Sequence, residues 1–192
     1  MNRENDILKD VKILLVVTGG IAAYKSADLA SKLTARAASV DCILTKHASK
    51  LIKPITFQTV TSRPVYTSMW KPIAASEFKI DHINLAESAD IVVVAPATAN
   101  IIAKMANGIC DDMASTTLCA VWAKPILMAP AMNSNMYANP AVQKNIDTLK
   151  SMNVTMIGPE TGRLACGTEG PGRMTEPADI IIAIEKIAAS LK

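Results

Sequence analysis

The sequence has no strong excess of charge of either sign and no long apolar run. Its formal net charge of +3 over 192 residues is too small and too evenly spread to indicate a surface for nucleic acid or lipid. The longest apolar run, residues 91–103, is broken by Pro96, Thr98 and Asn100, so no segment is expected to cross a bilayer. The first ten residues, MNRENDILKD, are polar and unlike a signal peptide. We therefore expect a cytoplasmic protein that binds neither nucleic acid nor membrane.

Cysteine and histidine are also scarce. Four cysteines and two histidines show no CxxC pair and no spacing typical of metal ligands, so we expect no metal site and free thiols in a reducing compartment. Cys42 falls in a predicted strand and Cys119 in a predicted apolar helix, and both are expected to be buried as small hydrophobes. The setting of Cys110, which precedes two aspartates, is left open.

What the sequence does contain is enough apolar material for one core. Half of the residues are hydrophobic, and no repeat or linker divides the chain, so we expect a single domain over residues 1–192 with a polar tail over about residues 1–10. Continuous apolar runs such as VKILLVV are typical of parallel strands covered on both faces. Strands are predicted at residues 11–17, 40–45, 91–95, 125–129 and 154–158.

Helical patterns alternate with these strands. Helices are predicted at residues 21–36, 47–52, 82–89, 98–108, 113–123, 140–152 and 177–192. Residues 54–79 are expected to be a looser, proline-containing region. The alternation predicts a Rossmann-like (flavodoxin-like) α/β fold, an open parallel sheet with helices on both faces in three α/β/α layers.

Ligands of such folds bind at the carboxyl ends of the strands, where several loops of this chain should meet. Gly19 and Gly20 stand at a helix N-terminus, where N–H groups and the helix dipole favour a phosphate, although such a pair is equally typical of a tight turn. The dinucleotide pattern GxGxxG is absent, so the loops indicate a mononucleotide pocket. Thr98 and Asn100 fit either a helix cap or a ligand contact.

Near the end of the sequence, residues 164–174 read LACGTEGPGRM. Three glycines and a proline argue against a helix or an inner strand, so we expect a flexible loop over about residues 159–176 that is disordered before substrate binds. The loop carries Cys166, whose reactivity depends on surroundings that the sequence does not show. Arg173 fits either a phosphate contact or solvent.

Five segments in this order resemble the flavin-dependent cysteine decarboxylases, which are homo-oligomeric flavoproteins. The segments are GGIAAYK (19–25), HINLAESAD (82–90), APATANIIAKMANGICDD (95–112), PAMNSNMY (130–137) and ACGTEGPGRM (165–174). The resemblance extends from about Lys12 to the last helix. Within the family, the PAMN form and the last segment resemble the branch that acts in coenzyme A biosynthesis.

The resemblance implies FMN as the cofactor and decarboxylation of 4'-phosphopantothenoylcysteine to 4'-phosphopantetheine as the reaction. In this family the thiol-bearing carbon is oxidised to a thioaldehyde, carbon dioxide leaves to give an enethiolate, and FMNH2 returns the electrons. The protein supplies binding, orientation and proton transfer.

The resemblance also implies which residues bind the cofactor. Gly19, Gly20 and Ile21 would hold the phosphate region of FMN with Thr45 nearby. The next loop would approach the flavin through Thr98, Ala99 and Asn100.

Catalysis and substrate binding fall on other positions. His82 takes the position of the family's catalytic histidine, and its pKa near neutrality suits proton transfer, although a lone histidine there could simply cap a helix. Asn133 would bind the substrate carboxylate through its amide NH2 group, with Met132 and Ala165 beside the substrate. Cys166 would protonate the enethiolate, as a thiol that is mostly protonated at neutral pH can, beneath a loop that closes as a lid.

Two other functions remain open at this stage. One is a peptidyl-cysteine decarboxylase of peptide antibiotic biosynthesis, and the other is a non-catalytic FMN-binding regulatory subunit. A flavin prenyltransferase fits less well, because His82 and Asn133 would have no role. The resemblance implies a trimer or dodecamer with the active site at a subunit interface. It leaves open whether the domain stands alone or is fused to a synthetase.

Overall fold

The structure, a computed structural model, describes residues 6–70, 80–165 and 167–191. Within these residues six strands form one parallel sheet in the order β3-β2-β1-β4-β5-β6, which is the Rossmann strand order. The strands are β1 (Lys12–Val17), β2 (Ser39–Leu44), β3 (Val65–Tyr66), β4 (Ile91–Ala97), β5 (Ile126–Pro130) and β6 (Thr155–Met156). The predicted open parallel sheet is confirmed.

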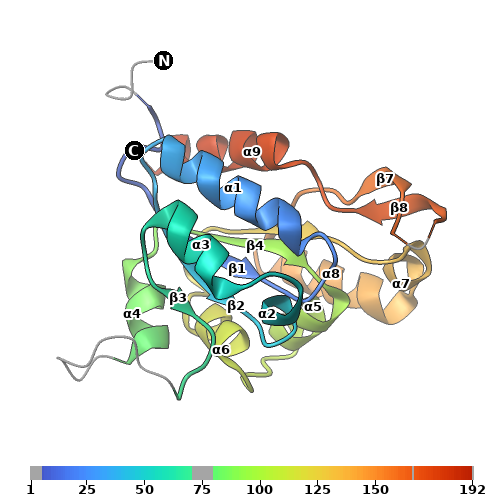
Figure 1. The fold of residues 1–192 in the computed structure, drawn as a ribbon. Helices are drawn as coiled ribbons and strands as arrows, with labels where there is room; N and C mark the ends of the chain where they lie inside the picture. The colour runs from blue at the N-terminus through green and yellow to red at the C-terminus, as the bar shows by residue number, and fades with distance from the viewer. Residues whose placement is uncertain (1–5, 71–79, 166, 192) are drawn as a thin grey trace.

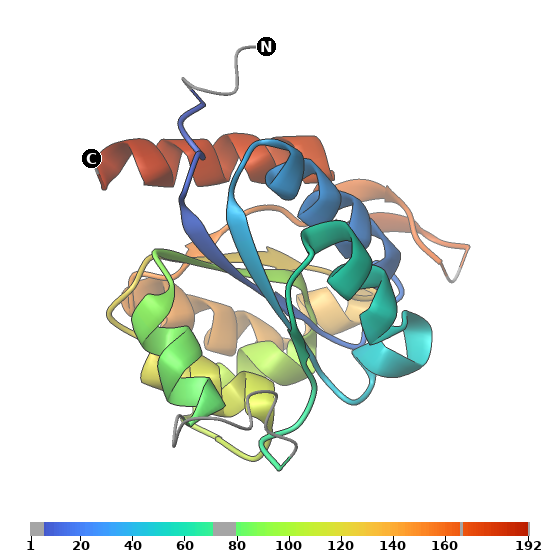
Figure 2. The ribbon, with the colours of Figure 1, turned by 60° about the vertical axis from the view of Figure 1, so that its left-hand side comes forward.

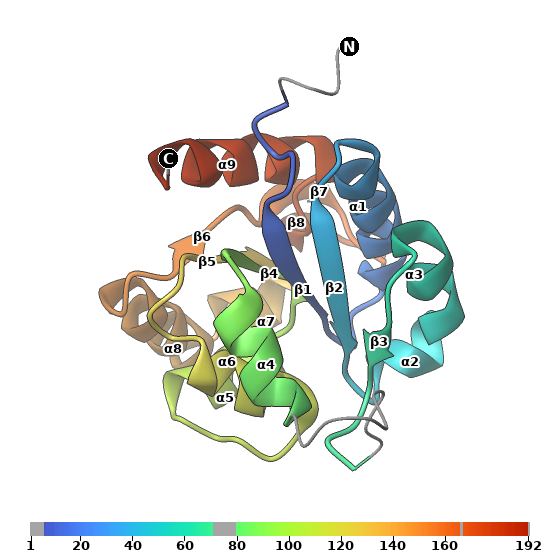
Figure 3. The ribbon, with the colours of Figure 1, turned by 90° about the vertical axis from the view of Figure 1, so that its left-hand side faces the viewer.

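Helices cover both faces of the sheet, as the sequence predicted. On one side lie α1 (Ala23–Ala35), α2 (Ala48–Leu51), α3 (Pro54–Thr61) and α9 (Pro177–Ser190) (Figures 1 and 2). On the other lie α4 (Asp81–Ser88), α5 (Ala99–Ala106), α6 (Met113–Ala120) and α8 (Pro140–Ser151), with α7 (Ser134–Ala138) beyond the end of β5 (Figure 3). None of the helices in the described part of the chain is long and apolar enough to cross a membrane.

The central strand β1 separates two apolar cores. From Ile13 to Val17, no side chain of β1 is more than 1% exposed. Ile13, Leu15 and Val17 pack in the core under α1 and α9, whereas the alternate residues Leu14 and Val16 pack in the core under α5 and α6. The apolar run from Ile13 to Val17 therefore serves both faces at once.

Two parts of the chain are more ordered than the sequence indicated. The region expected to be loose contains α3 and β3, because Pro54 occupies the first helical turn, where its missing N–H costs no hydrogen bond. The polar tail is shorter than expected, since Leu8 is fully buried and the Asp6 carboxylate accepts two hydrogen bonds from Arg36 at 2.8 and 2.9 Å.

The expectation of an irregular loop at residues 159–176 was wrong for the residues described there, whereas disorder before substrate binds stays a prediction. Strands β7 (Glu160–Arg163) and β8 (Glu169–Arg173) form an antiparallel hairpin (Figure 1). Each strand of this isolated pair leaves one edge free, so Pro171 interrupts no inner ladder. Glycine and proline therefore do not exclude strands here, although they would in the central sheet.

The burial of the cysteines differs in part from the prediction. Cys42 is fully buried, as expected, and burial raises the pKa of its thiol. Cys119 is exposed, so its predicted burial was wrong. Helix α6 buries Met113, Ala114 and Leu118 against the sheet, and the residue after Leu118 already points outward. Cys110 is exposed as well.

Candidate active site

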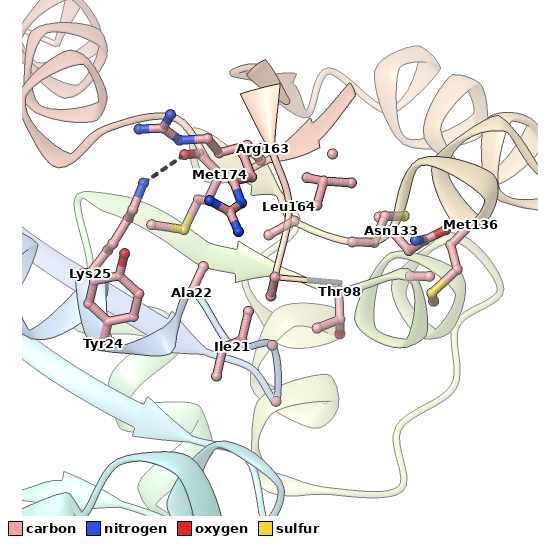
Figure 4. Close-up of a pocket in the computed structure, with 18 of the residues that line it drawn as sticks. Ile21, Ala22, Tyr24, Lys25, Thr98, Asn133, Met136, Arg163, Leu164 and Met174 are labelled. Atoms are coloured by element: carbon pink, nitrogen blue, oxygen red, sulfur yellow. Dashed lines mark hydrogen bonds between the residues drawn. The ribbon is translucent and has the colours of Figure 1, made fainter. Parts of the chain in front are cut away.

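A cavity of about 680 Å³ opens at the carboxyl ends of β1, β4 and β5 (Figure 4). Its walls come from the β1–α1 turn, the start of α5, the segment after β5 and the β7–β8 hairpin. The lining residues are 19–22, 24, 25, 98, 99, 131–133, 136, 163–165, 167 and 172–174. This is the predicted edge of the sheet, at the point between β1 and β4 where the strand order reverses.

The β1–α1 turn presents backbone donors to this cavity. The N–H groups of Ile21 and Ala22 donate to no acceptor among the described residues, and no side chain caps the start of α1. Gly19 lets the turn approach the segment after β2, since a Cβ on it would lie 2.4 Å from the Cβ of His47. Unpaired N–H groups at the positive end of a helix dipole are suited to a phosphate.

Side-chain hydrogen bonds fix the ends of β1 and β4 relative to each other. The Thr18 hydroxyl donates to the carbonyl oxygen of Pro96 at 2.6 Å, and the Thr98 N–H donates to the Thr18 hydroxyl at 3.2 Å. Although Thr98 precedes α5, its side chain makes no capping hydrogen bond. Of the two roles left open for Thr98, the structure therefore does not support the cap.

The amide of Asn133 is oriented by the helix that follows it. Its Oδ1 accepts a hydrogen bond from the backbone N–H of Asn135 at 2.8 Å, which caps α7. Because a backbone N–H can only donate, this contact assigns the carbonyl oxygen of the amide to the helix. The NH2 group of Asn133, which is a donor, is then the part that suits an anionic ligand.

The β7–β8 hairpin packs against the segment that follows β5. The Met132 N–H donates to the carbonyl oxygen of Gly172 at 2.9 Å. A Cβ on Gly172 would lie only 2.1 Å from the Met132 oxygen, and its φ of 139° is one that L side chains rarely adopt. Glycine at this position thus permits a close contact between the hairpin and the cavity wall.

A carboxylate joins α1 to the end of the hairpin. Glu176 Oε1 lies 2.7 Å from Lys25 Nζ and also pairs with Arg173, while Lys25 donates to the Met174 carbonyl oxygen at 3.3 Å (Figure 4). The hydrogen bonds from Lys25 and from Arg173 lower the pKa of Glu176. Arg173, whose role the sequence left open, is thus held in an ion pair.

Replacing Glu176 by glutamine should lower the free energy of unfolding at pH 7 by at most about 1 kcal/mol, because solvent screens a carboxylate that is 39% exposed. Since folding lowers its pKa, the ionised group stabilises the native state above the ordinary glutamate pKa of about 4.3. That stabilisation is lost as the pH falls through the lower native pKa. Urea unfolding of both proteins from pH 7 to pH 3 measures it, with Glu87→Gln on α4 as the control. A difference that does not shrink at acid pH would contradict the prediction.

The charged groups of the cavity lining are all cationic. Lys25, Arg163 and Arg173 line the cavity, and no aspartate or glutamate does among the described residues. The cavity therefore favours anionic ligands.

A sequence profile of the Flavoprotein family matches residues 1–189. This chain belongs to the Flavoprotein family. Among its family relatives, the coenzyme A biosynthesis bifunctional protein CoaBC of Bacillus subtilis (strain 168) is 47% identical over 180 residues, which are 94% of this chain and 44% of that protein. CoaBC of Escherichia coli (strain K12) is 42% identical over 170 residues, 88% of this chain and 41% of that protein. The chain thus spans less than half the length of these relatives.

Solved structures of flavoproteins share the fold. A PPC decarboxylase mutant complexed with pantothenoylaminoethenethiol is 30% identical with a TM-score of 0.80, over 92% of this chain and 97% of the other. The FMN-dependent cysteine decarboxylase SpaF is 29% identical with a TM-score of 0.81, over 95% and 99% of the two chains. The FMN binding protein AtHal3 is 30% identical with a TM-score of 0.79, over 95% and 98%. The family resemblance read from the five segments is confirmed.

The cavity brings together most of the site residues expected from the sequence. Those that line it are Gly19, Gly20, Ile21, Thr98, Ala99, Met132, Asn133 and Ala165. Thr45 does not line the cavity, and its hydroxyl accepts a hydrogen bond from the Ala48 N–H at 3.2 Å. Asn100 is exposed on α5 and does not line it either. Cys166 lies outside the described residues, between Ala165 and Gly167. The functional roles of all these residues stay predictions.

His82 does not line the cavity of its own chain. It is a half-buried residue in the first turn of α4, and Figure 1 places α4 at the opposite end of the molecule from the β7–β8 hairpin. His82 and the cavity are therefore separated within one chain.

Sequence reasoning missed several lining residues of this flavoprotein. Tyr24 and Lys25 belong to the quoted segment GGIAAYK, and their place in the first turn after Gly19 and Gly20 was the available signal. Arg163 and Leu164 lie in the predicted lid at about residues 159–176 but were not singled out as lining residues. They reach the cavity because the hairpin folds back over it.

Proposed function

We propose that this chain carries out the FMN-dependent decarboxylation of 4'-phosphopantothenoylcysteine to 4'-phosphopantetheine in coenzyme A biosynthesis. The observation that carries the proposal is a single cavity that combines a helix N-terminus with unpaired N–H groups, an oriented asparagine amide and a cationic lining. The CoaBC proteins, the PPC decarboxylase structure and the FMN-binding structures support it.

The residues present fit FMN. The phosphate would accept hydrogen bonds from the N–H groups of Ile21 and Ala22, and the ring system would lie toward Thr98 and Ala99. A cavity of about 680 Å³ is within the usual range of about 300 to 1,000 Å³ for ligand sites. When bound, FMN supplies oxidation of the thiol-bearing carbon of the substrate and the later return of those electrons.

Asn133 would hold the carboxylate of the substrate's cysteine. Its NH2 group can donate a hydrogen bond without a full positive charge, which would stabilise the ionised acid more than the transition state for loss of carbon dioxide. Met132 and Met136 would form the apolar wall beside it, with Ala165 opposite on the hairpin. The amide is already fixed by the α7 cap, so little ordering is needed on binding.

Two residues would move protons. His82 would transfer a proton during oxidation of the substrate, and Cys166 would protonate the enethiolate that remains after carbon dioxide leaves. A relative in which serine replaces a cysteine has been solved with pantothenoylaminoethenethiol, which supports a cysteine acting late in the sequence of steps.

We further propose that the active site is shared between copies in a homo-oligomer, a trimer or a dodecamer built from trimers. Support comes from His82, which lies away from the cavity of its own chain. It also comes from large exposed apolar side chains on the same side of the sheet as His82. The exposed fraction is 60% for Ile80, 47% for Ile109 and 76% for Trp122. Such side chains are typical of subunit contacts.

The cytoplasm is the compartment we propose, supported by the unpaired thiols of Cys42, Cys110 and Cys119.

Turnover by the purified, FMN-loaded protein tests the proposal. Incubation with 4'-phosphopantothenoylcysteine should release carbon dioxide and 4'-phosphopantetheine in equal amounts, with the flavin oxidised again at the end. The control is a peptide that ends in cysteine, the substrate type of a peptidyl-cysteine decarboxylase. Turnover of the peptide alone would reject the proposal, and FMN binding without turnover of either compound would favour a regulatory subunit.

A further inference from the structure

The cavity holds more positive side chains than the surrounding residues neutralise. Lys25 and Arg173 both pair with the single carboxylate of Glu176. Arg163 lines the same cavity and forms no ion pair with any other described residue. One guanidinium group is therefore left to act on a ligand.

A nearby acid does not take up this charge. Glu169 is the cross-strand partner of Arg163 in the β7–β8 hairpin, and opposite charges at such positions commonly pair. No ion pair forms between them within 4 Å, and Glu169 does not line the cavity whereas Arg163 does. The other arginine of the hairpin, Arg173, reaches from β8 toward β7. Its Nη1 lies 3.5 Å from the position that a Cβ on Gly162 would take.

The position of Arg163 fits the phosphate of an extended ligand whose carboxylate lies at Asn133. Figure 4 shows Asn133 and Met136 at one end of the cavity, Lys25 and Tyr24 at the other, and Arg163 above the space between them. The substrate of the proposed function carries its carboxylate at the cysteine end and its phosphate at the opposite end. With the carboxylate at Asn133 and the FMN phosphate at the N–H groups of Ile21 and Ala22, the second phosphate has Arg163 as its available cation.

We propose that Arg163 binds the 4'-phosphate of the substrate and so selects phosphorylated pantothenoylcysteine over the unphosphorylated compound and over peptides that end in cysteine. This inference rests on the proposed function. A guanidinium presents a planar pair of donors that matches phosphate geometry. Because the phosphate is remote from the reacting carbon, the contact acts on substrate binding, and its loss changes KM more than kcat.

The test compares FMN-loaded wild type with Arg163→Gln, Arg163→Lys and the control Lys150→Gln, which removes an exposed positive charge on α8. Each protein is assayed with phosphorylated and unphosphorylated pantothenoylcysteine. We expect Arg163→Gln to raise KM for the phosphorylated substrate about 10-fold, as for loss of a charge-assisted hydrogen bond, with kcat nearly unchanged. The KM for the unphosphorylated substrate should not change. Arg163→Lys should retain part of the preference, and Lys150→Gln all of it.

A second measurement is independent of turnover. The Kd values of 4'-phosphopantetheine and pantetheine are measured by calorimetry for the same holoproteins. Arg163→Gln should bind 4'-phosphopantetheine more weakly and pantetheine as tightly as wild type does. Equal losses for both compounds, or an unchanged preference, would overturn the inference. Loss of bound FMN would assign Arg163 to the cofactor phosphate instead. Absence of turnover in wild type would reject the proposed function, whereas the calorimetry would still decide the phosphate contact.

Discussion

Replacement of Asn133 by aspartate is expected to lower kcat/KM for 4'-phosphopantothenoylcysteine by at least about 100-fold, because juxtaposed like charges in a binding site cost several kcal/mol. The change is nearly isosteric. Aspartate is as good an N-cap as asparagine and can still accept the hydrogen bond from the Asn135 N–H. The fold and the α7 cap should therefore persist, and the loss should come from repulsion of the substrate carboxylate.

The measurement is steady-state turnover together with the FMN content of each protein. Asn135→Asp, which adds the same charge two residues away on α7, is the matched control and should keep wild-type activity. Asn133→Asp with full FMN and unchanged turnover would show that this amide does not meet the carboxylate. Loss of FMN together with activity would instead place Asn133 next to the cofactor.

Replacement of His82 by asparagine is expected to lower the rate of substrate oxidation about 100- to 10,000-fold, the usual contribution of a positioned acid or base. The control is Glu87→Gln, which alters an exposed residue on the same helix. Stopped-flow reduction of the flavin by substrate isolates this step from product formation. A normal rate of flavin reduction in His82→Asn would remove His82 from the chemistry.

Mixed oligomers then show from which copy His82 acts. When His82→Asn and Asn133→Asp chains are co-expressed in equal amounts and all the resulting assemblies are assayed together, a shared site should recover about one quarter of wild-type activity, since random mixing completes one site in four. Each variant alone should be almost inactive. If His82 served the cavity of its own chain, mixing would restore nothing, because every chain would still carry one defect.

The elements that the sequence predicted best are those that depend on local pattern. Residues 13–17 of the run VKILLVV are buried on both faces, as an apolar stretch without alternation requires. The turn at Gly19 and Gly20 lies at a helix N-terminus because glycine and the following apolar spacing are both local signals. The hairpin was not predicted, since its glycines fit a loop equally well and its pairing joins residues 160–163 to 169–173.

Burial was harder to predict at single positions. Cys119 was expected inside because α6 is apolar in composition. Its exposure depends on which side of the helix meets the sheet, a choice that Met113, Ala114 and Leu118 settle together. Leu8 was expected in a polar tail, yet it is fully buried among residues of the core beneath α1 and α9.

The sequence by itself determined the parallel α/β class, the phosphate-suited turn after β1, the polar residues at the ends of β4 and β5, and the family to which they belong. These properties follow from the spacing of apolar residues, from the positions of glycine and proline, and from side-chain chemistry. All three act over a few neighbouring residues. Only the tertiary structure decided that the hairpin closes on Met132 and that Glu176 pairs with both Lys25 and Arg173, while Arg163 forms no ion pair within the described part of the chain. Those outcomes depend on contacts between residues up to 151 positions apart, which local preferences do not specify.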